Sequence, residues 1–147
     1  MNIGIYIYNQ AEVLDFSGPF EVFATASRIC VESDPFNVFL IGETGHQVIA
    51  RGGYSVNPHY GFHNHPHLDV LIVVGGVHTE EMKKPSVLDW MAKQAQKALL
   101  VASVCTGAFL LAQAKVLTNQ KVTTHWEDIS DLENQYPNLT VIDTVRW

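Results

Sequence analysis

Cysteine is scarce in this chain. Cys30 and Cys105 are the only two among 147 residues. Small secreted domains held together by disulfides carry many more cysteines, so the sequence excludes that class of scaffold. Two cysteines in a chain without secretory features favour free thiols over a bridge. Cys30 falls in the first predicted helix, near Phe23 and Ile29, and we expect it to be buried and unreactive.

Basic residues and long apolar runs are scarce as well. Nine Lys and Arg against fifteen Asp and Glu give a formal net charge of −6 at pH 7. A nucleic-acid surface needs clustered basic groups, and Lys83-Lys84 is the only adjacent pair, so we expect no direct nucleic-acid binding. No apolar run is long enough to cross a bilayer, and the N-terminus does not resemble a signal peptide. We expect a cytoplasmic protein that does not contact membranes.

What the sequence does contain is a regular alternation of strand and helix patterns. Strands are expected at 3–8, 37–41, 68–74, 99–104, 122–124 and 138–142, with a hairpin joining 47–50 to 54–57. Helices are expected to open at Gly18-Pro19 and to cover 87–97, 107–114 and 126–135. The apolar runs 68–74 and 99–104 predict strands buried on both faces. This alternation predicts an α/β fold, a mostly parallel sheet with helices on both faces.

The carboxyl ends of the predicted strands bring three loops together. Ligands of parallel sheets bind beyond those ends. The loop 12–18, the Gly75-Gly76 turn and the turn around Cys105 all lie there. We therefore expect the functional site at this edge of the sheet.

The run Ser103-Val104-Cys105-Thr106-Gly107 lies between a strand pattern and a helix pattern. A small residue, a nucleophile and a nearby glycine at such a junction are typical of a nucleophile elbow. The following helix directs its N-terminal N–H groups at the sulfur, so we expect the pKa of Cys105 to fall below that of a free thiol. The local residues alone leave a buried structural cysteine equally open.

Four motifs then occur in a fixed order. They are Leu14-Asp15-Phe16-Ser17-Gly18-Pro19, Gly75-Gly76, Ser103-Val104-Cys105-Thr106-Gly107-Ala108-Phe109 and Thr123-Thr124-His125-Trp126. Together they resemble the ThiJ/PfpI superfamily, the single-domain relatives of class I glutamine amidotransferases. The resemblance covers essentially the whole chain and implies a flavodoxin-like three-layer sandwich with a cysteine nucleophile elbow. Isocyanide hydratases and the ligand-sensing domains of AraC-type regulators carry the same Cys-Thr-Gly and Thr-Thr-His-Trp motifs.

The resemblance implies roles for several side chains around Cys105. It places Asp15 against the sulfur, where burial and like charge should favour the protonated carboxyl. The alternatives are that Asp15 only stabilises a helix N-terminus, or that Glu21 is the acid. Thr106 is expected to position the substrate, and its N–H is expected to form an oxyanion-type hole with that of Gly75 or Gly76.

His125 resembles the family histidine that follows the Thr-Thr pair. It is a candidate base, and a structural role is the alternative. Trp126 is expected to pack in the core rather than to line the pocket. Histidines at positions 59, 63, 65 and 67 form a loop that suggests metal binding, but Pro66 makes a poor preformed site. We expect no metal and no cofactor.

The domain organisation is predicted from how the sequence compares with its relatives near the C-terminal end. Residues 1–147 are predicted to form one ThiJ/PfpI-like domain that lacks the C-terminal strands and helix of its relatives, and family resemblance implies a homodimer.

The predicted function is isocyanide hydration to an N-formamide through a Cys105 thioimidate. The alternatives are a non-catalytic sensing domain for a small-molecule ligand in an AraC-type regulator, and a glyoxalase/deglycase- or peptidase-like relative. Thr106 disfavours the peptidase, whose branch places histidine after the cysteine.

Overall fold

The computed structural model describes residues 1–30 and 35–145. Its strands are β1 (Asn2–Tyr6), β2 (Asn37–Ile41), β3 (Val48–Ile49), β4 (Ser55–Val56), β5 (Val70–Val73), β6 (Leu100–Ser103), β7 (Lys121–Val122) and β8 (Thr140–Val141). Its α-helices are α1 (Val13–Ile29), α2 (Pro85–Ala95), α3 (Gly107–Gln113) and α4 (Ile129–Gln135). Short 3-10 helices are η1 (Arg51–Gly53), η2 (Glu81–Lys83) and η3 (Trp126–Asp128).

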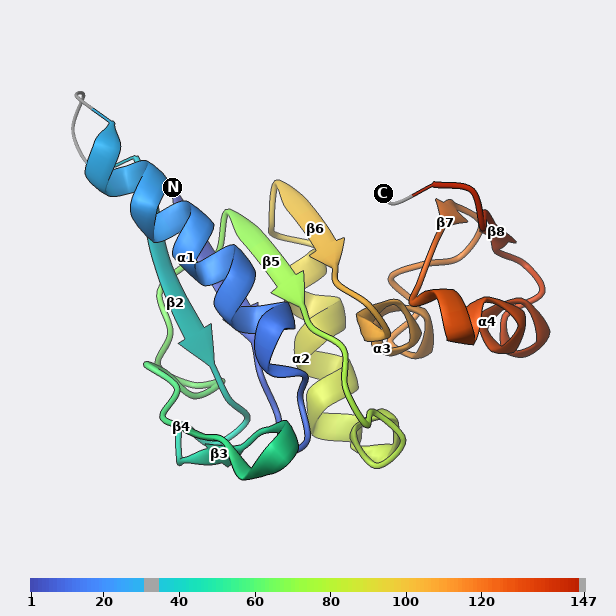
Figure 1. Ribbon diagram of the computed structural model, residues 1–147, viewed down its shortest axis with the longest axis horizontal. Helices are drawn as coiled ribbons and strands as arrows, with labels where there is room; N and C mark the ends of the chain where they lie inside the picture. The colour runs from blue at the N-terminus through green and yellow to red at the C-terminus, as the bar shows by residue number, and fades with distance from the viewer. Residues whose placement is uncertain (31–34, 146–147) are drawn as a thin grey trace.

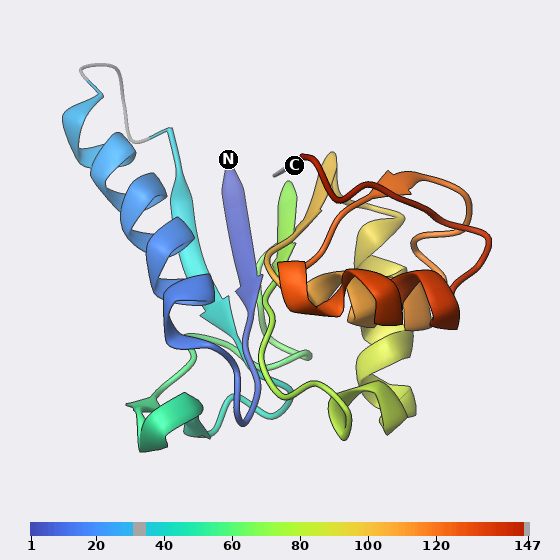
Figure 2. The same cartoon turned by 45° about the vertical axis from the view of Figure 1, so that its right-hand side comes forward.

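The central sheet has four parallel strands in the order β2-β1-β5-β6. α1 covers one face and α2 the other, as Figures 1 and 2 show from two directions. The buried core consists mainly of the apolar residues of β1, β2 and β5 and of the helix faces packed on them. The prediction of an α/β fold with a parallel sheet between helices is confirmed.

The order of the strands in the sheet determines where the candidate site lies. The chain adds β2 on one side of β1 and then returns to add β5 on the other, which makes the carboxyl ends of β1 and β5 a topological switch point. α1 begins shortly after β1, Gly75-Gly76 follows β5, and Cys105 follows β6. All three therefore lie at one edge of the sheet.

β6 differs from its prediction. The apolar run 99–104 predicts a strand buried on both faces, yet Leu100 is 58% exposed. Among the described strands only β5 pairs with β6, so β6 is an edge strand with one side open. Apolar composition predicts a tendency to be buried, but the neighbours that complete the burial are a property of the fold.

α1 begins earlier than predicted. The Gly18-Pro19 pair predicts the opening of the helix, but the helix starts at Val13 and runs through Pro19. Proline lacks the N–H that would bond one turn back, at a cost of about 3 kcal/mol in a helix interior. Burial of Phe16 in the core offsets this cost. As a result Asp15 lies in the first helical turn rather than in a loop.

The remaining elements extend the molecule past β6. β3 and β4 form the predicted antiparallel hairpin around residues 51–53. β7 and β8 pair in parallel as a separate small sheet, and with α4 they lie beyond β6 and α3 (Figures 1 and 2). No helix in the described part of the chain has the length and apolar character that crossing a membrane requires.

Candidate functional site

Cys105 occupies a tight turn between β6 and α3. Its φ is +52°, in the left-handed region that non-glycine residues rarely adopt. Gly107 makes the turn possible, because a Cβ at this position would lie 2.1 Å from the carbonyl oxygen of Val73. The Thr124 hydroxyl donates a hydrogen bond to the Cys105 carbonyl oxygen at 3.1 Å. The sulfur is thus held at the sheet edge by a strained backbone fixed from two sides.

Asp15 is the carboxylate that contacts Cys105. Its Oδ2 accepts a hydrogen bond from the Gly75 N–H at 3.0 Å, and its side chain lies close enough to that of Cys105 for each group to shift the pKa of the other. Burial raises the pKa of Asp15, while the bonds from Gly75 and Cys105 oppose the rise. The pKa of Asp15 therefore moves in the predicted direction. Glu21, the rival acid, is exposed and accepts a hydrogen bond from Thr25.

The structure corrects the expectation that Cys105 is a thiolate. Burial, and next the charge of Asp15, raise the pKa of Cys105 from 9.0 to about 11. The N–H and hydroxyl of Thr106 act in the opposite direction but do not outweigh them. The prediction relies on the dipole of α3, which is only seven residues long. Cys105 is therefore a thiol at neutral pH, and its titration is coupled to that of Asp15.

The glycine pair holds the other members of the site. The Gly76 N–H donates to the Thr106 hydroxyl at 3.0 Å, and that hydroxyl donates to the Gly76 carbonyl oxygen at 3.1 Å. A Cβ on Gly75 would lie 2.6 Å from the Thr106 nitrogen and 2.8 Å from Asp15 Oδ2. Both glycine N–H groups are thus occupied by Asp15 and Thr106. A substrate oxygen that used them would have to compete with these partners.

His125 and Trp126 lie at the periphery. His125 Nε2 lies 3.4 Å from Glu127 Oε2, and His125 is the last of the causes that act on the pKa of Asp15, after burial and the Gly75 bond. The prediction that Trp126 packs in the core is wrong: it is 75% exposed, because it opens η3 at the surface, where its ring contacts that of His125. The prediction that Cys30 is buried is also wrong, because it is exposed at the end of α1.

Tyr8 is a site residue that sequence reasoning missed. It is 3% exposed, and its hydroxyl donates to the Val74 carbonyl oxygen at 3.3 Å. Burial is the main cause that raises its pKa, followed by the charges of Glu81, Asp15 and Cys105. Its position at the end of the first predicted strand is the only signal in the sequence.

An open cavity of about 500 Å³ gives access to Cys105. Its walls are the residues of β6 and the turn that follows, together with Leu111, Leu117 and the stretch 121–124. The lining exposes both apolar and polar atoms, which suits a small organic molecule with one polar end.

The histidine-rich loop does not form a metal centre in the described residues. His59 Nδ1 accepts a hydrogen bond from the Leu40 N–H, and His65 Nε2 accepts one from Trp90 Nε1. His67 faces Asp69 at 3.8 Å. Each of these histidines has a different partner, and no three metal-binding side chains gather anywhere in residues 1–30 and 35–145.

Comparison with known proteins places these features in a family. A sequence profile of the DJ-1/PfpI family matches residues 1–144. The chain is 32% identical over 127 residues to an isonitrile hydratase of Pseudomonas putida, covering 86% of this chain and 53% of that protein. It is 28% identical over 129 residues to the HTH-type transcriptional regulator CdhR of Pseudomonas aeruginosa, covering 88% of this chain and 38% of the regulator.

The fold is also similar to that of a solved structure. A ThiJ/PfpI family protein from Pseudomonas syringae superposes with a TM-score of 0.80 at 24% identity, covering 99% of this chain and 59% of that one. The chain thus spans about half the length of the isonitrile hydratase and a smaller part of the regulator. The match over nearly all of its residues shows that this chain belongs to the DJ-1/PfpI family.

Proposed function

We propose that this chain is an isonitrile (isocyanide) hydratase-like enzyme, in which Cys105 adds to the isocyanide carbon and water releases an N-formamide. The observation that carries the proposal is the pairing of the Cys105 thiol, set in its tight turn, with the Asp15 side chain that the Gly75 N–H holds in place. Such a pair can remove and return a proton within one site. The identity of 32% to an isonitrile hydratase supports it.

The first step forms the carbon–sulfur bond. Asp15 takes the thiol proton as the sulfur attacks the terminal carbon of the isocyanide. The lone pair of that carbon then takes the proton from Asp15, which gives a thioimidate, S–CH=N–R. Because Cys105 starts as a thiol, Asp15 acts here as the general base that generates the nucleophile only when substrate is present.

The second step breaks the same bond with water. Water attacks the thioimidate carbon, and Asp15 passes one proton of the water to the nitrogen. The resulting hydroxyl then loses its proton as the C–S bond breaks, and the sulfur leaves with the bonding pair. Asp15 returns the proton to the sulfur, so the thiol is restored and the product is R–NH–CHO. Thr106, whose N–H and hydroxyl lie against the sulfur, is placed to orient the attacked carbon.

The test is turnover of an aryl isocyanide, followed as formamide by chromatography. Wild-type protein should form product, and Cys105→Ala should form none. Cys30→Ala is the matched control, because Cys30 is exposed at the end of α1, and it should retain full activity. Absence of turnover in a wild-type protein whose circular dichroism shows that it is folded would contradict the proposal.

A sensing domain is the second candidate function. The raised pKa of Cys105, caused by burial and then by Asp15, leaves little thiolate at neutral pH, as suits a pocket that binds without reacting. The match to the regulator CdhR covers 88% of this chain. This candidate predicts saturable binding of a small molecule that survives Cys105→Ser, measured by calorimetry, together with no product.

A further inference from the structure

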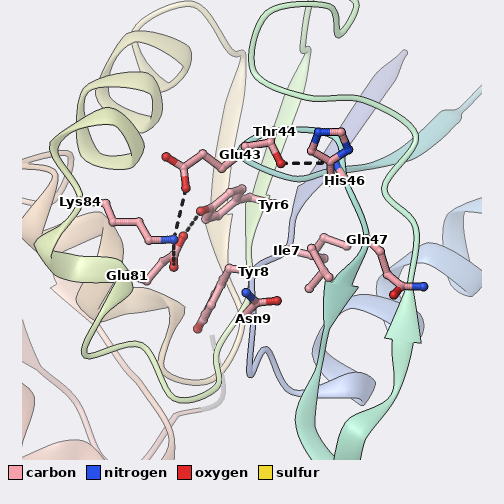
Figure 3. A pocket seen from close by; sticks show the side chains of 11 residues that line it. Tyr6, Ile7, Tyr8, Asn9, Glu43, Thr44, His46, Gln47, Glu81 and Lys84 are labelled. Carbon is pink, nitrogen blue, oxygen red and sulfur yellow. Dashed lines mark hydrogen bonds and ion pairs between the residues drawn. The ribbon is translucent and has the colours of Figure 1, made fainter.

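A second buried polar cluster lies at the same edge of the sheet. Glu81, in η2, is only 4% exposed, and one of its carboxylate oxygens accepts a hydrogen bond from the Tyr6 hydroxyl. Its other oxygen pairs with Lys84 Nζ at 2.9 Å. Figure 3 shows these three side chains converging beside Tyr8. A buried carboxylate is retained only where such partners satisfy it.

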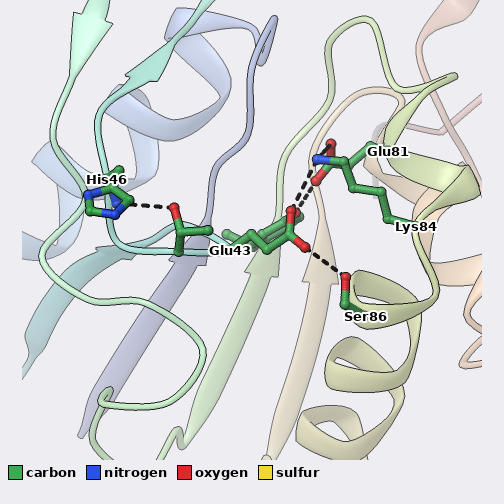
Figure 4. Close-up of polar contacts among 7 residues, drawn as sticks. Glu43, His46, Glu81, Lys84 and Ser86 are labelled. Carbon is green, nitrogen blue, oxygen red and sulfur yellow. Dashed lines mark hydrogen bonds and ion pairs between the residues drawn. The ribbon is translucent and has the colours of Figure 1, made fainter.

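Lys84 extends the cluster to the loop after β2. Its Nζ lies 3.2 Å from Glu43 Oε2, and Glu43 Oε1 accepts a hydrogen bond from the Ser86 hydroxyl at 2.7 Å (Figure 4). The Ser86 bond is the main cause that lowers the pKa of Glu43. Burial lowers the pKa of Lys84, but its bonds and charge contacts with Glu81 and Glu43 outweigh this and raise it. The cluster joins β1, the loop after β2, η2 and the start of α2.

The cluster lines a cavity of about 190 Å³, but the polar groups have partners among themselves. No buried side-chain nitrogen or oxygen in the described residues lacks a hydrogen-bond partner. The buried polar groups of the cluster therefore satisfy one another. Tyr6, Glu43, Glu81, Lys84 and Ser86 thus form a polar brace: their hydrogen bonds and ion pairs join segments that are distant in the sequence.

The brace continues into the Gly75-Gly76 turn. From η2, the Met82 N–H donates to the His78 carbonyl oxygen at 3.0 Å. His78 Nδ1 lies 3.1 Å from the Gly76 carbonyl oxygen, and its ring stacks on Phe109 of α3 at 4.8 Å. η2 is thus linked by two successive contacts to the glycine that holds Thr106.

A second route runs through the tyrosines of β1 and the residues that follow it. Tyr6, bound to Glu81, stacks on Tyr8 with ring centres 5.8 Å apart. The Tyr8 hydroxyl bonds the carbonyl oxygen of Val74, the residue before Gly75. The start of the stretch 74–82 is therefore tied through Tyr8 to Tyr6, the residue that bonds Glu81 near its other end.

We propose that Glu81 is a positioning residue for the Cys105–Asp15 pair: clamped between Tyr6 and Lys84, it fixes the stretch 74–82 so that Gly75 holds Asp15 and Gly76 holds Thr106. The proposal rests on the proposed function only in taking Cys105 as the reacting atom. Glu81 itself contacts neither Cys105 nor a substrate.

Amide hydrogen exchange, measured by NMR, tests this directly. Glu81→Gln keeps the shape of the side chain but removes its charge, and Tyr6→Phe removes only the hydroxyl. Both should accelerate exchange at Gly75 and Gly76 by about tenfold or more relative to the β5 amides, because the turn opens locally. Glu80→Gln is the matched control on the neighbouring, exposed residue, whose side chain pairs with Lys83, and it should change nothing.

The pH profile of Cys105 alkylation by iodoacetamide is the second readout, measured in a Cys30→Ser background. A loosened turn admits water to Cys105, and burial is the largest cause of its raised pKa. The midpoint should therefore move down from about 11 toward 9.0 in Glu81→Gln and Tyr6→Phe. A cluster that only stabilised the fold would lower the melting temperature without moving this midpoint.

The outcomes separate clearly. Selective exchange at Gly75 and Gly76 with a shifted midpoint supports the proposal. Exchange that rises uniformly, or not at all, with an unchanged midpoint overturns it. If Glu81→Gln does not fold, Tyr6→Phe decides alone. Neither readout uses turnover, so a wild-type protein that fails to hydrate isocyanides would sink the proposed function and leave this result intact.

Discussion

At the scale of the residue, the site is a coupled acid pair. Cys105 and Asp15 face each other in a half-buried position, where two negative charges are unfavourable, so the pair keeps one proton at neutral pH. The elbow turn and the helix that follows it favour a thiolate, but desolvation and the Asp15 charge prevail. In the proposed mechanism Asp15 therefore acts as the base that takes the thiol proton.

Replacing Asp15 by asparagine tests this coupling. Burial, the largest cause of the raised Cys105 pKa, remains in Asp15→Asn, but the next cause, the carboxylate charge, is removed. The pKa of Cys105 should fall from about 11 toward 9.0, and the thiolate fraction at pH 8 should rise by roughly tenfold. Alkylation of Cys105 at pH 8 should therefore be faster than in the wild type, whereas formamide production should be lost with the base. An alkylation rate equal to or below that of the wild type would show that the pair is not coupled.

At the scale of the element, three glycines allow strand ends and helix starts to meet. Gly107 packs against the backbone of β5, and Gly75 lies between Thr106 and Asp15. Gly76 has a φ of +141°, and a Cβ on it would lie 2.3 Å from the Gln10 carbonyl oxygen. No side chain fits at any of them. The site depends on backbone contact between elements as much as on its reactive side chains.

Gly107→Ala should destabilise the fold strongly. Its Cβ would meet the Val73 carbonyl oxygen at 2.1 Å, and overpacking against backbone costs about 3 kcal/mol or more. The control is Gly18→Ala in α1, where no atom lies within 4 Å and a gain of about 0.5–1 kcal/mol is expected from helix propensity. Urea unfolding measures both. Equal free energies of unfolding for the two variants would contradict the packing of the elbow.

The sequence predicts elements better than it predicts their neighbours. The buried strand 68–74, the hairpin and the glycine turns follow from local patterns of apolar residues and turn residues. The predicted start of α1 is wrong because proline at position 19 is typical of a first helical turn. The helix instead starts at Val13, and this places Phe16 on its buried face. The exposure of Leu100 is not predicted, because a periodic pattern does not show whether a further strand follows.

The candidate site, too, is predicted from the sequence only in part. Motifs identify Asp15, Thr106 and Cys105, and the fold brings them together. The sequence predicts the wrong direction for the pKa of Cys105, because desolvation depends on every element packed around the sulfur. The Tyr6–Glu81 contact joins residues 75 positions apart, and no local pattern indicates it.

At the scale of the whole molecule, the raised pKa of Cys105 links the site to stability. Burial and Asp15 make the native state bind the Cys105 proton more tightly than the unfolded chain does. The stabilising effect is complete below about pH 9.0 and is lost as the pH rises toward about 11. The free energy of unfolding should fall across this window.

Comparison with Cys105→Ser isolates this effect, because tyrosines and lysines titrate alike in both proteins. Urea unfolding at intervals between pH 8 and 11 should show a steeper loss of stability in the wild type than in Cys105→Ser. Parallel curves would mean that the pKa of Cys105 is the same in the folded and unfolded states. The homodimer implied by family resemblance stays a prediction.

The covalent adduct tests the central claim most directly. Wild-type protein is mixed with an aryl isocyanide, quenched in acid within one turnover and analysed by intact-mass and peptide mass spectrometry. The account predicts a mass increase of one whole isocyanide on the peptide that contains Cys105, because the thioimidate keeps the thiol proton on carbon. The increase should disappear as formamide accumulates, and Cys105→Ala should never show it. Folded wild-type protein that binds the isocyanide saturably, yet shows neither adduct nor formamide, would contradict the enzyme and favour the sensing domain.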